Sequence, residues 1–141
     1  MAPSASVAPM MNRQRDCERG AAAVEFALIL IPLLVLLLGI IEFGYVFNQQ
    51  LTVTNAAREG ARVLAITKDS GEATAAAASA ASTLGGTPTI SVVQVCPTSG
   101  SGGDAEVALS LPMTTLTGIE SLVPGFPSIT LTGRGVTPCG G

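Results

Sequence analysis

The chain begins with a polar segment, continues with one long apolar run, and ends in short stretches where apolar and polar residues alternate. The apolar run covers residues 21–47 and contains two charged residues, Glu25 and Glu42. As a helix the run is about 40 Å long, enough to cross a hydrocarbon core of about 30 Å with both ends in the interface. We therefore predict a transmembrane helix over residues 21–47.

Two other roles for the apolar run fit the sequence less well. A buried core helix needs a large protein around it, and the chain has 141 residues. A cleaved secretory signal has an apolar stretch of about 7–15 residues, whereas this run is longer and no small-residue cleavage site follows it closely.

The segment 48–67 is predicted to continue as a helix, because small and apolar residues recur in it at helical spacing. They form one narrow face: Val53, Ala56, Ala57, Gly60, Ala61 and Leu64. Small residues allow another backbone to approach closely. The partner is either a helix of another subunit or a sheet of this chain, and the sequence leaves both open.

The opposite face of this helix is polar and carries Asn55, Arg58, Glu59 and Arg62. We interpret it as a face in contact with solvent or lipid headgroups. A dedicated interaction patch is the alternative.

The remaining pattern predicts a small α+β domain. Asp69 and Glu72 are spaced as in a capping box before an alanine-rich helix, which Gly85, Gly86 and Pro88 end. Strand patterns follow at 88–96, 105–111 and 128–132. The predicted fold class is α+β: a long N-terminal transmembrane helix continuing outside the membrane, a second helix, and a three-stranded antiparallel sheet with one face covered by helix.

The connection 112–127 is long for a hairpin and carries the apolar residues Ile119, Leu122, Val123 and Phe126. Long loops are often functional. The other interpretation is that these apolar residues pack under the sheet.

Composition and charge exclude several classes of function. The chain is 48% hydrophobic and 12% charged, with a mean hydropathy of +0.53 and a net charge of −3. Nucleic-acid binding needs clustered basic charge, which is lacking. Without histidine, the usual catalytic sets and the commonest metal ligand cannot form. We expect no enzymatic activity, no catalytic residues, no cofactor, no metal, and neither nucleic acid nor a small-molecule substrate as partner.

The motifs at both ends of the apolar run are specific. Gly20 precedes a small-residue stretch and then Glu25 and Phe26, as in type IV prepilins, where a short basic leader ends in glycine and glutamate is the fifth mature residue. Together with the later motif positions, the chain resembles the TadE-like family, pseudopilins or minor pilins of the tight-adherence (Tad) pilus. These later positions are Pro32, Gly39, Glu42, Gly44, Ala57, Arg58, Glu59, Gly60, Ala61 and Arg62.

The resemblance implies processing and assembly partners. A prepilin peptidase, an inner-membrane aspartic protease, would cleave between Gly20 and Ala21. The other implied partners are the lipid bilayer, other pseudopilins or pilins, and the pilus assembly platform. The expected organisation is a leader at 1–20, the transmembrane helix at 21–47, extramembrane helices at 48–86, and a β domain at 87–141.

The expected function is assembly of a Tad, type IVb-like pilus as a membrane-anchored pseudopilin. The alternative is a surface-anchored adhesin or binding module that contacts a ligand through its sheet and the loop 112–127. The expected location is the inner (cytoplasmic) membrane, crossed once. Three basic residues precede the span, Arg13, Arg15 and Arg19, and three follow it, Arg58, Arg62 and Lys68, so the counts are equal. Because the first group lies just before the span and the larger, acidic part of the chain follows it, we place the N-terminus in the cytoplasm and the C-terminal domain in the periplasm or outside the cell.

Glu25 is expected to act in assembly, because a carboxylate at the bilayer edge is costly unless it is paired. After cleavage it could pair with the new α-amine of Ala21 on a neighbouring subunit. The alternative is that Glu25 merely extends to the interface.

Of the three cysteines, Cys17 lies in the expected leader. Cys96 and Cys139 remain in the exported part, where an oxidising compartment favours a disulfide between them. This bond would close a loop of about forty residues and contribute about 4 kcal/mol in the chain-entropy model.

Overall fold

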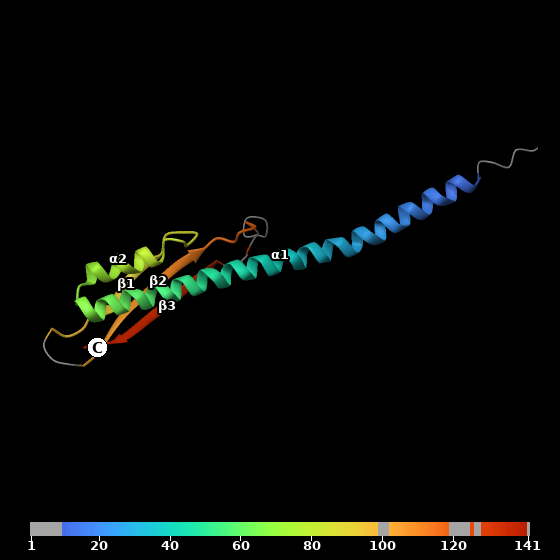
Figure 1. The fold of residues 1–141 in the computed structure, drawn as a ribbon. Coiled ribbons are helices and arrows are strands. Elements are labelled where there is room, and N and C mark those ends of the chain that lie inside the picture. The colour runs from blue at the N-terminus through green and yellow to red at the C-terminus, as the bar shows by residue number, and fades with distance from the viewer. Residues whose placement is uncertain (1–9, 99–101, 119–124, 126–127, 141) are drawn as a thin grey trace, which may run out of the picture. The chain divides into compact units, whose positions relative to one another are not determined.

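The computed structural model describes residues 10–98, 102–118, 125 and 128–140, with side chains from residue 20 onward. The chain divides into two compact units, Met1–Ile40 and Ile41–Gly141. Its elements in chain order are α1 (Met10–Thr67), α2 (Ser70–Ala80), β1 (Thr89–Gln94), β2 (Asp104–Met113) and β3 (Ile129–Pro138) (Figure 1). The predicted α+β class, with a long N-terminal helix, a second helix and a three-stranded antiparallel sheet, is confirmed.

The described part of the first unit is helix α1 up to Ile40. Consecutive large apolar side chains are exposed there, from Leu33 to Leu38, so the helix is apolar around its whole circumference. Within Gly20–Thr67 the helix is long and apolar enough to cross a membrane. A helix that is apolar all round and exposed is typical of a membrane span. The structure is thus consistent with a membrane-anchored protein.

Helix α1 begins earlier than the sequence pattern predicts. It starts at Met10, so the second half of the expected leader is helical. The alanine, serine and proline content of residues 1–10 predicts disorder. Of these residues the structure describes Met10, which is helical, and the others lie outside the described residues.

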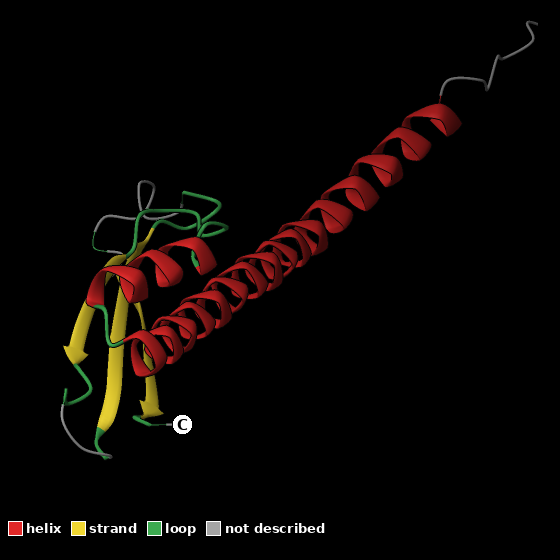
Figure 2. Ribbon diagram, turned by 60° about the vertical axis from the view of Figure 1, so that its left-hand side comes forward, coloured by secondary structure: helices red, strands yellow, loops and turns green. Residues whose placement is uncertain are grey.

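The second unit is a sheet covered on one face by helix (Figure 2). Its strand order is β1-β2-β3, and both pairings are antiparallel. On the central strand, alternate residues are buried because they point toward the helices: Ala105, Val107, Leu109 and Leu111. Val53 and Leu64 of α1 complete the group of large, fully buried side chains.

Strand β3 is longer than the pattern predicts, ending at Pro138 rather than near residue 132. The pattern breaks at Gly133 and Gly135, because glycine inside a strand normally weakens it. In the structure both glycines lie on the buried face, next to the backbone of α1. A Cβ on Gly133 would lie 2.8 Å from the Val53 carbonyl oxygen, and one on Gly135 would overlap the carbonyl of Ala57. The glycines therefore allow the helix to rest directly on the strand.

The junction between the two helices is closed by backbone caps. Lys68 has a φ of 58°, and its N–H donates to the Leu64 carbonyl at 3.0 Å, which ends α1. Asp69 then caps α2, since its Oδ1 accepts from the N–H groups of Gly71 at 2.6 Å and Glu72 at 3.2 Å. The sequence signal for the start of the second helix is thus confirmed.

The structure contains the disulfide between Cys96 and Cys139, whose Cα atoms are 5.7 Å apart. Cys96 follows β1 and Cys139 follows β3, so the bond links the two outer strands of the sheet across β2. The N–H of Cys139 also donates to the Gly103 carbonyl at 2.9 Å. This end of the sheet is therefore held by both a covalent bond and a hydrogen bond.

Candidate functional site

The first group of motif residues lies on the exposed helix of the first unit. It comprises Gly20, Ala21, Glu25, Phe26, Pro32 and Gly39. Helix α1 continues without interruption through Gly20 and Ala21 and through Pro32. A Cβ on Gly20 or Gly39 would meet nothing within 4 Å, so these glycines are not required by packing within the described chain.

The second group of motif residues is buried inside the second unit. Ala57 and Ala61 are fully buried, and Gly60 lies where α1 meets α2 and the sheet. A Cβ on Gly60 would lie 3.0 Å from the Cβ of Ala77 and 3.2 Å from Cγ1 of Val107. The sequence left two partners open for this small-residue face. In the structure the face packs against the chain's own sheet and against α2.

Glu42 holds the loop that follows β2. Its Oε1 accepts a hydrogen bond from the N–H of Leu116 at 2.8 Å, and its Oε2 accepts one from Thr117 at 3.2 Å. Hydrogen bonds to a charged group are stronger than those between neutral groups. The contact joins residues 74 positions apart, and the sequence pattern gives no signal for it.

Two neighbouring glutamines fasten α1 to the rest of the second unit. Gln49 is buried, and its Oε1 accepts from the N–H of Gly85 at 3.2 Å. The Nε2 of Gln50 donates to the Thr132 carbonyl at 2.9 Å. The sequence analysis did not single out these two residues. Two side-chain amides just after an apolar run are nevertheless a signal, because amides in such a place tend to bind backbone groups.

These contacts define the two ends of the second unit. The proximal end is where Glu42 meets the loop after β2. The distal end is where α1 finishes, and there the Lys68 Nζ donates to the Pro97 carbonyl at 3.4 Å, close to the disulfide. Because β2 runs from the distal to the proximal end, the connection from β2 to β3 lies at the proximal end.

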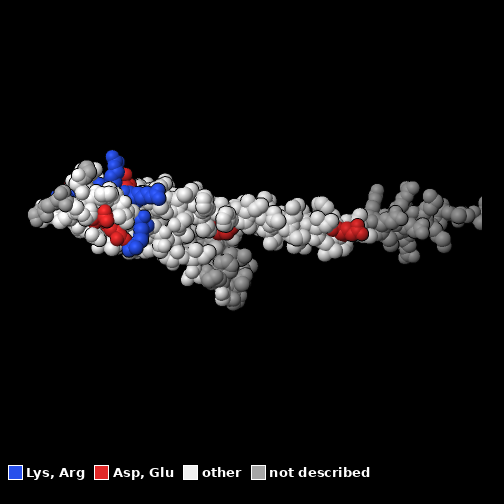
Figure 3. Space-filling model, turned by 90° about the horizontal axis from the view of Figure 1, so that it is seen from below, with Lys and Arg blue, Asp and Glu red and all other residues white. Residues whose placement is uncertain are grey.

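An open groove of about 720 Å³ lies between the polar face of α1 and strand β3. It is lined by Asn55, Arg58, Glu59, Arg62, Arg134, Val136 and Thr137. Figure 3 shows blue Lys and Arg side chains close to red Asp and Glu side chains. The ion pair on the helix side, Arg62 to Glu59 at 3.6 Å, is exposed and worth at most about 0.5 kcal/mol. The polar face of α1 is thus a basic, solvent-facing surface.

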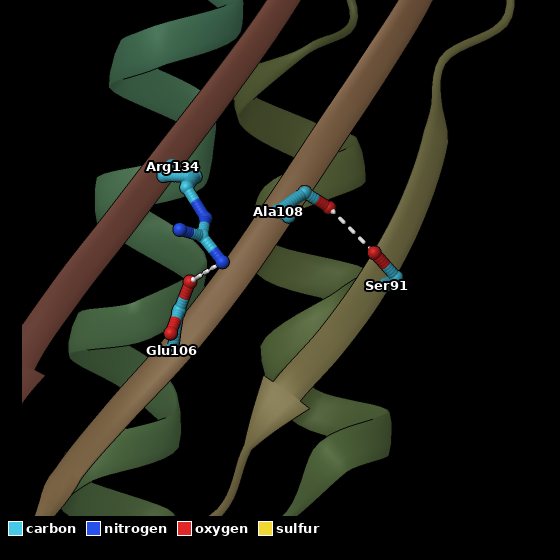
Figure 4. A network of polar contacts seen from close by, with 4 residues as sticks. All are labelled: Ser91, Glu106, Ala108 and Arg134. Atoms are coloured by element: carbon cyan, nitrogen blue, oxygen red, sulfur yellow. Dashed lines mark hydrogen bonds and ion pairs between the residues drawn. The ribbon is translucent and has the colours of Figure 1, made fainter.

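The uncovered face of the sheet is polar near its centre (Figure 4). Arg134 of β3 and Glu106 of β2 point toward each other, with Nη2 and Oε1 2.7 Å apart. The Ser91 hydroxyl donates to the Ala108 carbonyl at 3.3 Å. Opposite charges on adjacent strands stabilise the pairing of a sheet by about 0.2–1 kcal/mol, so this pair has a structural role.

The described residues do not show a reaction centre. They include no group of three or more Cys, Asp or Glu residues that could hold a metal ion. Their polar contacts instead connect α1 to the sheet and to its loops. This arrangement suits a protein that presents an apolar helix and a small folded domain.

The comparisons with known proteins bear on the helix. No curated protein and no solved structure matches the chain. Residues 20–62 match the family model described as TadE-like protein, which confirms the resemblance that the motifs indicate.

Proposed function

We propose that the chain is a membrane-anchored pseudopilin or minor pilin that takes part in assembly of a Tad pilus after cleavage by a prepilin peptidase. One observation carries the proposal: the TadE-like match begins at Gly20, the residue after which cleavage is expected. It then covers the whole apolar run and all of the buried small-residue face of α1 except Leu64. The partners of the mature protein would be the bilayer, other pilins and the assembly platform.

The helical state of the cleavage site bears on the mechanism of processing. A protease binds its substrate in an extended conformation, so α1 has to unwind locally around Gly20. Glycine lowers the cost of this step, because it is less favourable than alanine in a helix by about 1 kcal/mol. A small residue at this position also fits a narrow protease subsite. Both properties support Gly20 as the residue before the cleaved bond.

The alternative role, a surface adhesin that binds through the loop 112–127, has less support. The described start of this loop is tied to Glu42 at the proximal end of the second unit. Glu42 lies near the C-terminal end of the expected span 21–47, so the start of the loop would face the bilayer rather than project away from the cell. The apolar residues Ile119, Leu122, Val123 and Phe126 of this loop lie outside the described residues. The structural role is therefore the better supported of the two.

The mature N-terminus tests the proposal. We expect that co-expression with a prepilin peptidase yields a chain whose first residue is Ala21, as measured by mass spectrometry of the intact membrane protein. A catalytically inactive peptidase should leave the chain unprocessed. Gly20→Leu should block cleavage because of its bulk, whereas Gly20→Ala should retain part of it. A mature chain starting elsewhere, or full-length protein only, would exclude the prepilin role.

A further inference from the structure

The hydrogen bonds of Glu42 place one loop of the second unit at a defined level along α1. Glu42 is the first charged residue after the charge-free stretch 26–41. It binds the backbone N–H groups of Leu116 and Thr117. The start of the loop after β2 therefore lies level with the end of this charge-free stretch.

This level corresponds to the edge of a bilayer. Along a helix, Glu25 and Glu42 are about 26 Å apart at 1.5 Å per residue. A hydrocarbon core is about 30 Å thick, so both carboxylates fall near its two edges when the run spans it. A carboxylate at this depth has to be satisfied by polar partners. For Glu42, two backbone donors of the loop supply them.

The side chain that this contact brings to the membrane level is apolar. Leu116 is 60% exposed, although its backbone is fixed by Glu42. On α1, Phe43 and Phe47 stack with their ring centroids 6.3 Å apart and are 73% and 56% exposed. Apolar and aromatic side chains at this level bury themselves about 5–10 Å into the boundary between headgroups and acyl chains.

We propose that Leu116, positioned by Glu42, inserts into the lipid interface and gives the second unit a contact with the bilayer in addition to its helix. The inference rests on the membrane anchoring in the proposed function. A helix alone leaves the anchored chain free to tilt in the bilayer. A second contact with lipid on one side of α1 restricts that tilt and keeps the proximal end of the second unit at the membrane surface.

The absence of tryptophan from the chain allows a direct test. Three variants of the full chain each receive one tryptophan and are reconstituted into phosphatidylethanolamine–phosphatidylglycerol vesicles whose acyl chains are brominated near the headgroups. Leu116→Trp is the test. Leu36→Trp reports on the span, and Val136→Trp is the matched control, because Val136 is an equally exposed apolar residue, 57% exposed, near the distal end of β3. Bromine quenches tryptophan emission at close range.

We expect Leu116→Trp and Leu36→Trp to lose emission in brominated relative to unbrominated vesicles, and Val136→Trp to keep it. If Leu36→Trp is quenched and Leu116→Trp behaves like Val136→Trp, the chain is anchored and the loop contact does not exist. If neither Leu36→Trp nor Leu116→Trp is quenched, the membrane anchoring itself fails, and the proposed function with it.

A second variant tests the positioning role of Glu42. Glu42→Ala removes both acceptors for the loop amides. Tryptophan at position 116 should therefore be quenched less when Glu42→Ala is also present. Tryptophan at position 36 should be quenched equally with and without Glu42→Ala. Equal quenching of Leu116→Trp with and without Glu42 would show that the carboxylate does not hold the loop at the membrane.

Discussion

At the scale of single residues, glycines determine how closely α1 approaches the sheet. Gly133 and Gly135 leave room for the helix backbone at Val53 and Ala57, and Gly60 leaves room for α2. Because the contacts of Gly133 and Gly135 involve backbone atoms, they cannot be relieved by rotating a side chain. The small residues of the TadE-like segment and the glycines of β3 are thus two sides of one contact.

Gly135→Ala should destabilise the second unit, because the new methyl group would overlap the carbonyl of Ala57. Overpacking of this kind costs about 1–3 kcal/mol. In a domain of about 60–100 residues, each kcal/mol lowers the Tm by about 4–8 °C. The measurement is thermal unfolding of the detergent-solubilised chain, followed by pulse proteolysis of the sheet.

Gly44→Ala is the matched control for this substitution. Gly44 is also in the second unit, but a Cβ there meets nothing within 4 Å and alanine favours a helix. Its Tm should be unchanged or higher. A Tm of Gly135→Ala equal to that of the unsubstituted chain would mean that α1 does not rest on β3 as described.

At the scale of elements, the disulfide compensates for a modest core. The buried face of the second unit is mostly alanine, with few large side chains. The bond links residues 43 positions apart, for which the chain-entropy model gives about 4 kcal/mol. Cores of this size often depend on such a covalent link.

Replacing both Cys96 and Cys139 with serine should therefore give a protease-sensitive second unit and a lower Tm, while the apolar helix still inserts into membranes. Limited proteolysis and alkaline extraction of membranes measure the two properties separately. Cys17→Ser should change neither, because Cys17 precedes the expected cleavage site. Two freely alkylated thiols in the mature, non-reduced protein would contradict the disulfide.

The elements differ in how far the sequence predicts them. Periodicity was sufficient for α1 from residue 21 onward, for the start of α2 at Asp69 and for β2, because each depends on local pattern and capping. Periodicity failed for the second half of β3, because Gly133 and Gly135 weaken an isolated strand. In the folded chain these glycines are needed because α1, more than 70 residues earlier in the sequence, packs against them. The partner of the small-residue face was undecided because helices and sheets both accept small residues. The contact of Glu42 with Leu116 arises from tertiary structure alone.

At the scale of the whole molecule, the TadE-like segment has two parts with different environments. Its first part, with Glu25, is exposed on the helix of the first unit. Its second part, around Gly60, is buried within the second unit. The second part is thus used for the fold of the chain itself, and the first part is available to lipid and to other subunits. Under the proposed function, we therefore expect the determinants of assembly on the apolar helix.

Glu25→Gln should separate assembly from folding. A neutral side chain is less costly in lipid than a carboxylate, so insertion should be intact, and the Tm of the second unit should not change because Glu25 lies outside it. Pilus number should fall, since the α-amine of Ala21 in a neighbouring subunit would lose its counter-charge and remain unpaired at the bilayer edge. Glu25→Asp, which keeps the charge, should retain part of the output. Membrane extraction measures insertion, pulse proteolysis measures the stability of the second unit, and electron microscopy counts the pili. Normal piliation with glutamine at this position would instead show that Glu25 simply extends to the interface.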